Sequence, residues 1–488
     1  MKNKILKNKI FTAYLSLILS IVAFVLNINT SVAQNVIKFP ASNASNVCPD
    51  TQFKLEFSTV PVLNNAGTIK LFKSDGTLLE TIDLSQTPLP LGPPAAATWP
   101  WKQTYSGSIV NVVKVSIDDK SAIISFGIGA MTYNTGYYVT IDQNVFSNAA
   151  TLGFTGIFAN QWSITTKPAA PTADLDYTVA TDGTGDFATI QGALDYIPAN
   201  NTTNAKIFVK NGIYVGLLSS KSKNNITLEG ESVDGVFIKS FNNATMNSTV
   251  RYGDNFIGNN LNFINLTFIN TTPNGGSQAE TISLSGNQNV IVNCQFFSYQ
   301  DTVLISGKAY LKDCLIEGNV DFIWGNGTVF FQSCEIRSAL RSGYNVQARN
   351  GQTNHGYAFA DCNITSTSSA ANGSVLGRDA GTTTATNVYA EIVYLNCTLG
   401  SHISSLGWNT SRLTTTQAST IMFAEYKSVD PSNNLINVSG RDPNSKQLSD
   451  SQNTQYRDLN WFFNGWTPVL PTYSLAKKPT VSIATATY

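Results

Sequence analysis

A short segment built around a cysteine recurs in this chain with a fixed spacing of 20 residues. The repeat is marked by Cys294, Cys314 and Cys334. A fixed period of this length predicts a solenoid, in which each repeat forms one coil that stacks on the next. Equal positions on neighbouring coils then lie at the spacing of adjacent strands, about 4.8 Å. Asp301 and Asp321 each stand seven residues after a cysteine of the repeat, so the spacing predicts two carboxylates side by side.

The composition favours strands and excludes some classes of partner. Only 13% of the 488 residues are charged, and 11% are aromatic, which is typical of a mainly β chain rather than a helical one. A chain of this length is expected to form more than one domain. Lys plus Arg equals Asp plus Glu at 31 each, so no net field attracts nucleic acid or an anionic membrane. We expect neither as a partner.

The N-terminus has the three parts of a secretory signal peptide. Basic residues precede an apolar run over about 14–26, and Ser31-Val32-Ala33 forms a small-residue cleavage site. The apolar run is short for a membrane-spanning helix, which needs about 20 residues, although an uncleaved anchor is the alternative. The pattern predicts a bacterial protein that is secreted, periplasmic or on the cell surface, without membrane insertion after cleavage. We expect the mature chain to be a monomer.

Six cysteines in an exported protein would normally suggest disulfides. Five of them stand two positions before an apolar residue, which one repeated inward-facing position would explain; they are Cys294, Cys314, Cys334, Cys362 and Cys397. Stacked side chains point the same way rather than toward each other, which does not suit disulfide geometry. Cys48 lies far upstream with no obvious partner. We therefore predict free thiols.

The chain divides into five parts by composition and hydrophobic pattern. After the signal peptide (1–33), residues 35–167 contain about seven short alternating strands, which read as an immunoglobulin-like β-sandwich. A linker rich in Pro and Ala (168–175) leads to the solenoid (176–466), and residues 467–488 form a C-terminal tail. The apolar spacing over 189–197 predicts a helix that caps the first coil. The predicted class is all-β.

Four ordered motifs carry a family resemblance. They are Gln278-Ala279-Glu280, Tyr299-Gln300-Asp301-Thr302, Val320-Asp321-Phe322-Ile323-Trp324-Gly325 and Leu376-Gly377-Arg378. Together they resemble the signature motifs of the pectin methylesterases, which are carbohydrate esterases with a right-handed parallel β-helix. The resemblance covers about residues 176–466. It implies a substrate of methyl-esterified galacturonan, the polymer of pectin, and products of free carboxylate and methanol.

The resemblance also implies a role for each site residue. Asp321 would attack the ester carbonyl, and Asp301 would protonate the departing methanol and then activate water. Gln278 and Gln300 would stabilise the oxyanion, while Arg378 would hold Asp321 ionised. The resemblance implies no metal and no cofactor.

The residue types themselves favour the same division of labour. Two stacked carboxylates cannot both ionise cheaply, so the pair separates into an acid and a base, and a nearby guanidinium selects the one that stays charged. Neutral amides can stabilise an oxyanion without neutralising a carboxylate nucleophile. The two histidines, His355 and His402, lack the Gly-x-Ser-x-Gly elbow that often marks a Ser-His-Asp triad.

Aromatic residues near the motifs are candidates for sugar stacking. We expect Trp324, Trp408 and Phe322 to contact substrate, although core positions are the alternative for the tryptophans. The chain departs from the family at Asp379 and Ala380, where Pro and Trp usually follow Leu-Gly-Arg. A stacking platform is therefore missing, which puts the substrate pattern in question.

Other functions remain open at this point. The chain could be an esterase or thioesterase with a non-pectin acyl substrate, or a non-catalytic carbohydrate-binding solenoid. A pectate lyase on a similar solenoid would need a calcium site of clustered acids. The two aspartates could also serve only to cap turns. Glu280 adds a charge near the site that the resemblance does not explain.

Overall fold

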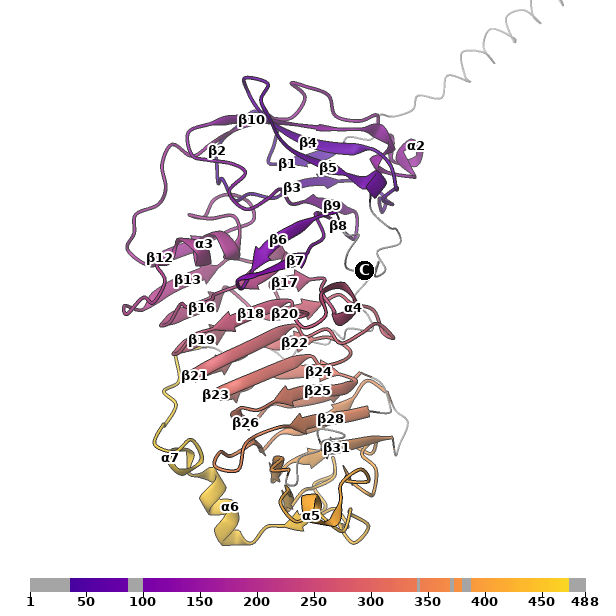
Figure 1. The fold of residues 1–488 in the computed structure, drawn as a ribbon, viewed down its shortest axis with the longest axis vertical. Coiled ribbons are helices and arrows are strands. Elements are labelled where there is room, and N and C mark those ends of the chain that lie inside the picture. The colour runs from indigo at the N-terminus through magenta and orange to yellow at the C-terminus, as the bar shows by residue number, and fades with distance from the viewer. Residues whose placement is uncertain (1–35, 87–99, 340–342, 369–372, 380–387, 474–488) are drawn as a thin grey trace, which may run out of the picture.

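The structure is a computed structural model that describes residues 36–86, 100–339, 343–368, 373–379 and 388–473. It contains an N-terminal sandwich of mainly antiparallel sheets and a long stack of parallel coils (Figure 1). The predicted signal peptide and most of the predicted tail lie outside the described residues. No helix among the described residues is long and apolar enough to cross a membrane.

Two sheets form the sandwich. The first contains, in spatial order, β1 (Ile37–Phe39), β3 (Phe53–Glu56), β9 (Ser121–Ile124) and β8 (Val115–Asp118). The second contains β2 (Ala44–Val47), β11 (Ser163–Thr166), β10 (Gly136–Ile141), β4 (Thr68–Lys73) and β5 (Leu78–Asp83). Burial alternates along β10, as expected for a strand with one face on the core. An immunoglobulin-like assignment of this sandwich stays a prediction.

Short elements complete the sandwich. They are η1 (Leu84–Gln86), η3 (Gln143–Val145), α2 (Ala149–Leu152) and the hairpin of β6 (Lys102–Tyr105) and β7 (Ser108–Asn111). In Figure 1 the hairpin lies between the sandwich on one side and the first coils of the solenoid on the other. Tyr105 of the hairpin is buried in the sandwich core.

The coils form three columns of parallel strands. The first column runs through β12 (Asp176–Val179), β13 (Ala205–Val209), β16 (Ile226–Gly230), β19 (Leu261–Ile264), β21 (Ile282–Val292), β23 (Val303–Lys312), β26 (Thr328–Gln332), β29 (Tyr357–Ala360), β32 (Glu391–Leu395), β35 (Met422–Tyr426) and β36 (Lys446–Gln447). The second runs through β15 (Leu218–Ser219), β18 (Asp254–Ile257), β21, β23, β25 (Val320–Gly325), β28 (Gly343–Ala348), β31 (Ser374–Arg378) and β34 (Trp408–Asn409). The long strands β21 and β23 belong to both columns because each continues around a corner.

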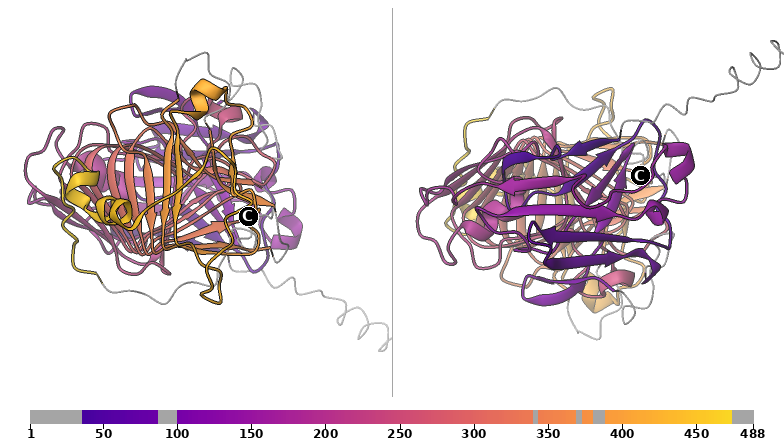
Figure 2. Two further views of the ribbon diagram at one scale, coloured as in Figure 1. Left: turned by 90° about the horizontal axis from the view of Figure 1, so that it is seen from below. Right: turned by 90° about the horizontal axis from the view of Figure 1, so that it is seen from above.

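The third column forms a separate sheet. It contains β14 (Gly212–Val215), β17 (Val236–Ser240), β20 (Thr267–Asn270), β22 (Gln295–Phe297), β24 (Leu315–Gly318), β27 (Glu335–Ser338), β30 (Asn363–Ser366) and β33 (Thr398–Leu399). Figure 2 shows the coils stacked behind one another along the solenoid axis. The prediction of a parallel β-helix is confirmed.

The predicted 20-residue register is present in the third column. The N–H of Leu315 donates to the carbonyl of Cys294 at 2.9 Å, and the N–H of Glu335 donates to the carbonyl of Cys314 at 2.8 Å. Pairing of β27 with β30 and of β30 with β33 continues the cysteine position to Cys362 and Cys397. All six cysteines are buried free thiols, as predicted.

A helix closes the N-terminal end of the solenoid. Helix α3 (Ile190–Tyr196) begins after Thr189, whose side chain accepts a hydrogen bond from the N–H of Gly192, and it buries Ile190 and Leu194 in the main core. The predicted cap is therefore confirmed as a helix. Further short helices are α4 (Ala244–Asn247), α5 (Thr415–Ala418), α6 (Asp450–Arg457) and α7 (Leu459–Phe462).

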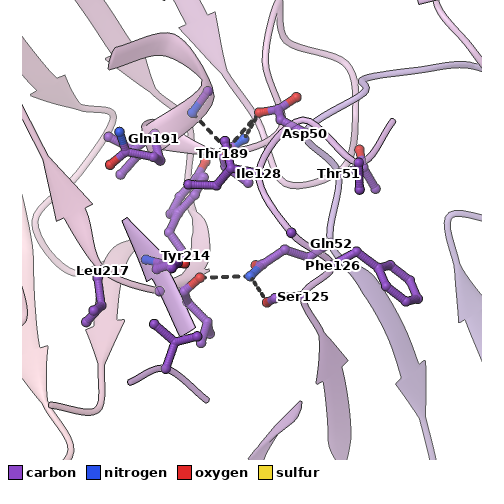
Figure 3. Close-up of a pocket in the computed structure, with 18 of the residues that line it drawn as sticks. Asp50, Thr51, Gln52, Ser125, Phe126, Ile128, Thr189, Gln191, Tyr214 and Leu217 are labelled. Atoms are coloured by element: carbon purple, nitrogen blue, oxygen red, sulfur yellow. Dashed lines mark hydrogen bonds between the residues drawn. The ribbon is translucent and has the colours of Figure 1, made fainter. Parts of the chain in front are cut away.

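Specific polar contacts join the sandwich to the first coils. Asp50 accepts a hydrogen bond from the hydroxyl of Thr189 at 2.7 Å, and the side-chain amide of Gln52 donates to the carbonyl of Val215 at 2.8 Å. These contacts border a cavity of about 170 Å³ lined by both bodies (Figure 3). These bonds join the sandwich directly to the N-terminal end of the solenoid.

Candidate active site

The two aspartates occupy equivalent positions on consecutive coils. Gln300 bridges in parallel to Val320, and the N–H of Asp301 donates to the carbonyl of Val320 at 3.0 Å. Both aspartates have positive φ, 65° at Asp301 and 48° at Asp321, in the left-handed region that Asp tolerates better than most residues. The chain thus turns at the same point on both coils, next to the second column. The structure places the two side chains next to each other in the stack.

A third carboxylate extends this arrangement. Ile282 pairs with Val303, so Glu280 has the same offset from β21 that Asp301 has from β23. We call Glu280, Asp301 and Asp321 the acid stack. Glu280 is fully buried, and burial raises its pKa. The charge that the sequence left unexplained is therefore a neighbour of the predicted acid.

Asp321 is held by donors on the following coils. The Nε–H of Arg378 donates to Oδ1 of Asp321 at 2.7 Å, and Nη2 of Arg378 contacts Oδ2. The side-chain amide of Gln347 donates to the same Oδ2 at 3.2 Å. The guanidinium of Arg378 also lies 4.1 Å from the ring centre of Tyr344. Two parallel N–H donors fix both the charge and the direction of a carboxylate.

Asp301 has a different environment. Nη2 of Arg251 donates to Oδ2 of Asp301 at 2.9 Å, while Nε of the same guanidinium donates to both oxygens of Glu280 at 2.9 and 3.0 Å. Burial raises the pKa of Asp301 to about 8; Glu280 and Asp321 act in the same direction, whereas Arg251 and Arg349 oppose them. A pKa of about 8 favours the protonated form of Asp301 at neutral pH.

The two aspartates are thus chemically unequal. Asp321 has a guanidinium to itself, whereas Asp301 shares its guanidinium with a buried glutamate. A pair of carboxyl groups whose environments separate in this way can supply one proton donor and one anionic nucleophile. This arrangement can support nucleophilic attack by Asp321 with proton transfer by Asp301.

The predicted oxyanion residues lie beside the acid stack. The N–H of Ala279 donates to the carbonyl of Gln300 at 3.1 Å, so the segments that carry Gln278 and Gln300 are neighbours on consecutive coils. Both glutamine side chains are half-buried. Their role in stabilising an oxyanion stays a prediction.

The three aromatic residues expected to contact sugar differ in exposure, and contact by Trp324 stays a prediction. Trp324 is half-buried, with the guanidinium carbons of Arg251 and Arg349 at 5.4 and 4.7 Å from its ring centre. Phe322 and Trp408 are completely buried in the solenoid core, where Trp408 stacks on Phe423. The prediction of sugar contact is wrong for Phe322 and Trp408, because neither ring exposes a face.

The structure describes one of the two residues at which the chain departs from the family after Leu-Gly-Arg. Asp379 is fully buried and lies 3.8 Å from a guanidinium nitrogen of Arg412. Its side chain therefore turns into the protein rather than toward a ligand. Ala380 lies outside the described residues.

Several residues at the site were missed from the sequence. They are Arg251, Tyr344, Gln347 and Arg349, of which Gln347 pairs in register with Trp324. The only signal was the short Gln347-Ala348-Arg349 run at the end of β28, and the irregular coil length there hides its register. Within the described residues, no group of three or more His, Cys, Asp or Glu is arranged to hold a metal ion.

Comparison with known proteins agrees with this geometry. The pectinesterase family model matches residues 176–458, more than half of the chain. The chain belongs to the pectinesterase family. Probable pectinesterase 8 of Arabidopsis thaliana is 30% identical over 307 residues, which cover 58% of this chain and 74% of that relative. Pectinesterase 31 of the same plant is 34% identical over 208 residues, which cover 38% of this chain and 64% of that relative.

Solved structures of pectinesterases share the fold. A pectin methylesterase in complex with a hexasaccharide is 24% identical, with a TM-score of 0.51, and the match covers 62% of this chain and all of that one. At this identity the likeness concerns the fold alone. It shows that the parallel β-helix of this chain is the pectinesterase fold.

Proposed function

We propose that this chain hydrolyses the methyl esters of galacturonan, the polymer of pectin, to free carboxylate and methanol. The observation that carries the proposal is the contrast within the acid stack: Arg378 holds Asp321, whereas the neighbouring Asp301 shares Arg251 with the buried Glu280, and burial raises the pKa of Asp301 to about 8. Membership of the pectinesterase family supports the ester, and a relative seen with a hexasaccharide supports a polymeric substrate.

The proposed reaction has two steps. An Oδ of Asp321 attacks the carbonyl carbon of the ester, and the tetrahedral oxyanion is stabilised by the side-chain amides of Gln278 and Gln300. The C–O bond to the methoxy group then breaks as Asp301 gives its proton, which releases methanol and leaves an anhydride with Asp321. Asp301, now ionised, takes a proton from water, and the resulting hydroxide attacks and frees Asp321.

Substrate contact is proposed for Trp324 alone among the three aromatic candidates. Its ring is half-buried, and it borders the column that carries Gln347 and Arg378. A flat ring beside the reacting carboxylates suits the face of a sugar.

We also propose how the chain is organised and where it acts. Residues 1–33 would direct export and be removed, 35–167 would form the immunoglobulin-like domain, 168–175 the linker, 176–466 the catalytic solenoid and 467–488 the tail. The mature chain would act outside the cytoplasm as a monomer. Sequencing the N-terminus of the exported protein tests the first point, with Gln34 expected as the first residue.

The deciding experiment is methanol release from methyl-esterified polygalacturonate. We expect release by the wild-type chain and a loss of at least about a thousandfold in Asp321→Asn, because the amide cannot act as the nucleophile. Asp313→Asn is the matched control, since Asp313 also has a positive φ of 54° and contacts Tyr473 away from the acid stack. Full activity of Asp321→Asn would refute the mechanism, and turnover of short acyl esters alone would refute the substrate.

A further inference from the structure

The segment before β18 brings a charged residue to the acid stack from outside the regular coils. It spans residues 248–253, between α4 and β18, and its Arg251 bonds Glu280 and Asp301 at once. Only 19% of the Arg251 side chain is exposed, and Glu280 is fully buried. A guanidinium with two carboxylate partners in a buried site is fixed in direction as well as in charge.

The N-terminal sandwich holds this segment in place. The hydroxyl of Tyr105 in β6 donates to the carbonyl of Gly253 at 3.0 Å, two residues after Arg251. At the other end of the segment, the side-chain amide of Asn111 donates to the carbonyl of Met246 at 2.8 Å, and the N–H of Asn111 donates to Oδ1 of Asn247 at 2.7 Å. The hairpin β6–β7 therefore clamps both ends of the segment.

Apolar packing joins the same elements. Met246 of α4 belongs to the core of the sandwich rather than to that of the solenoid, and Val250 and Tyr252 pack against the same core. The segment that carries Arg251 is thus built on the N-terminal sandwich. The solenoid holds the segment as well, because the side-chain amide of Asn242 donates to the carbonyls of Val250 and Tyr252. Loss of the sandwich contacts would therefore loosen the position of the guanidinium rather than release it.

We propose that Arg251 is a positioning residue for Asp301, and that the hairpin β6–β7 makes the N-terminal sandwich a structural part of the active site. The proposal rests on the proposed function, because it assigns Arg251 to the residue that transfers the proton. Arg251 directs one oxygen of Asp301 and leaves the other available, while Glu280 on the preceding coil anchors Arg251.

Among the described residues, four charged groups act on the pKa of Asp301 and enter the expected pH dependence. They are Arg251 before β18, Glu280 before β21, Asp321 in β25 and Arg349 after β28. The two cations oppose the raised pKa of Asp301, and the two carboxylates contribute to it. Removing Arg251 should therefore raise the pKa of Asp301 further, and removing the charge of Glu280 should lower it.

The first experiment measures how kcat/KM for methanol release by the full chain depends on pH. The quantity compared is the alkaline limb, the pH range over which kcat/KM falls as Asp301 loses its proton. Because Asp301 must carry its proton, we expect Arg251→Gln to move the limb upward by about one pH unit or more and Glu280→Gln to move it downward. In the double variant the two shifts should largely cancel. Arg251→Lys should keep the limb near that of the wild type with kcat lowered about tenfold, since the charge stays but the paired geometry is lost.

The second experiment tests the support from the sandwich. Tyr105→Phe removes the hydroxyl that donates to the carbonyls of Gly253 and Tyr252, and we expect kcat to fall several-fold, with the alkaline limb moved in the direction of Arg251→Gln. Tyr137→Phe is the matched control, because Tyr137 is equally buried in the sandwich but bonds the N–H of Thr132 instead. Equal kcat values for the two variants would overturn the role of the hairpin.

The results separate this inference from the proposed function. If the wild-type chain releases no methanol, the function fails, and an NMR titration of the Asp301 carboxyl, identified by its absence from Asp301→Asn, still tests the opposed shifts. If the chain is active but the limbs of Arg251→Gln and Glu280→Gln coincide with that of the wild type, the inference is overturned. If Arg251→Gln fails to fold, the isosteric Glu280→Gln and the charge-preserving Arg251→Lys carry the test.

Discussion

The Nε–H of Arg378 points directly at Oδ1 of Asp321, at 2.7 Å. This bond comes from β31, two strands further along the second column, so the orientation of the nucleophile depends on a residue 57 positions away in the chain.

Replacing Arg378 with Lys should impair the chemical step. A lysine keeps the charge but cannot present two parallel donors, and charged hydrogen bonds of this kind contribute about 1.5–3 kcal/mol. We expect kcat to fall about ten- to hundredfold with little change in KM, measured as methanol release. Arg412→Lys, at the ion pair with Asp379, is the control and should leave kcat unchanged. A rise in KM alone would mean that Arg378 serves substrate binding.

Gln347 should support the nucleophile through one bond. Its amide donates to Oδ2 of Asp321 at 3.2 Å, and Gln347→Leu removes that donor without adding charge. We expect about a tenfold lower kcat, consistent with the loss of one hydrogen bond to a charged group. Gln332→Leu removes a similar amide-to-carboxylate bond, to Asp361, at a site away from the acid stack. Its kcat should match that of the wild type, and equal losses in the two variants would contradict the prediction.

Asp301 should make the fold less stable in alkaline solution. Its pKa of about 8 lies above the ordinary value of 3.8, so its contribution to stability is complete below pH 4 and is lost as the pH rises through 8. Asp301→Asn cannot ionise and should be more stable than the wild type at pH 9, by on the order of a few kcal/mol. Thermal or denaturant unfolding between pH 5 and 9 measures the difference.

A second variant gives the opposite sign. Arg457 lowers the pKa of Asp361, so the wild type should exceed Asp361→Asn in stability at neutral pH, and this advantage should vanish as the pH falls. For the first variant, if the free energies of unfolding of the wild type and Asp301→Asn changed in parallel with pH, Asp301 would not titrate as described.

The cysteine column should be inert in the native protein. Burial raises the pKa of Cys294 to about 12, and all six thiols are buried and unpaired. We expect no reaction with a disulfide reagent such as DTNB until the chain is unfolded in guanidinium chloride, when six thiols per chain should react. Fewer than six after unfolding would reveal a disulfide.

The sequence predicted most where the coils have constant length. Cys294, Cys314 and Cys334 fixed the register over two coils, and this was sufficient to place Asp301 beside Asp321. After β25 the coils vary: Trp324 pairs with Gln347, 23 positions on, so register could not be counted from the repeat. Arg251 comes from a segment outside the coils, and nothing in its spacing connects it to Asp301.

The sequence also could not predict which aromatic side chains point into the core and which point toward the site. Phe322 and Trp324 stand two positions apart near a turn, where the strict alternation of a strand does not apply. The turn at Asp321, with its positive φ, sends Phe322 into the core and leaves Trp324 at the site. Trp408 lies in a two-residue strand, which is too short to reveal a pattern of burial.

The position of the corner strands β21 and β23 determines when the site would be lost during partial unfolding. Each is shared by two columns, and both lie near the middle of the stack, several coils from either end. A solenoid that frays does so coil by coil from its ends, because each coil is held only by its neighbours. The sandwich holds the N-terminal coils, so partial melting by heat should begin at the C-terminal coils and reach the acid stack last.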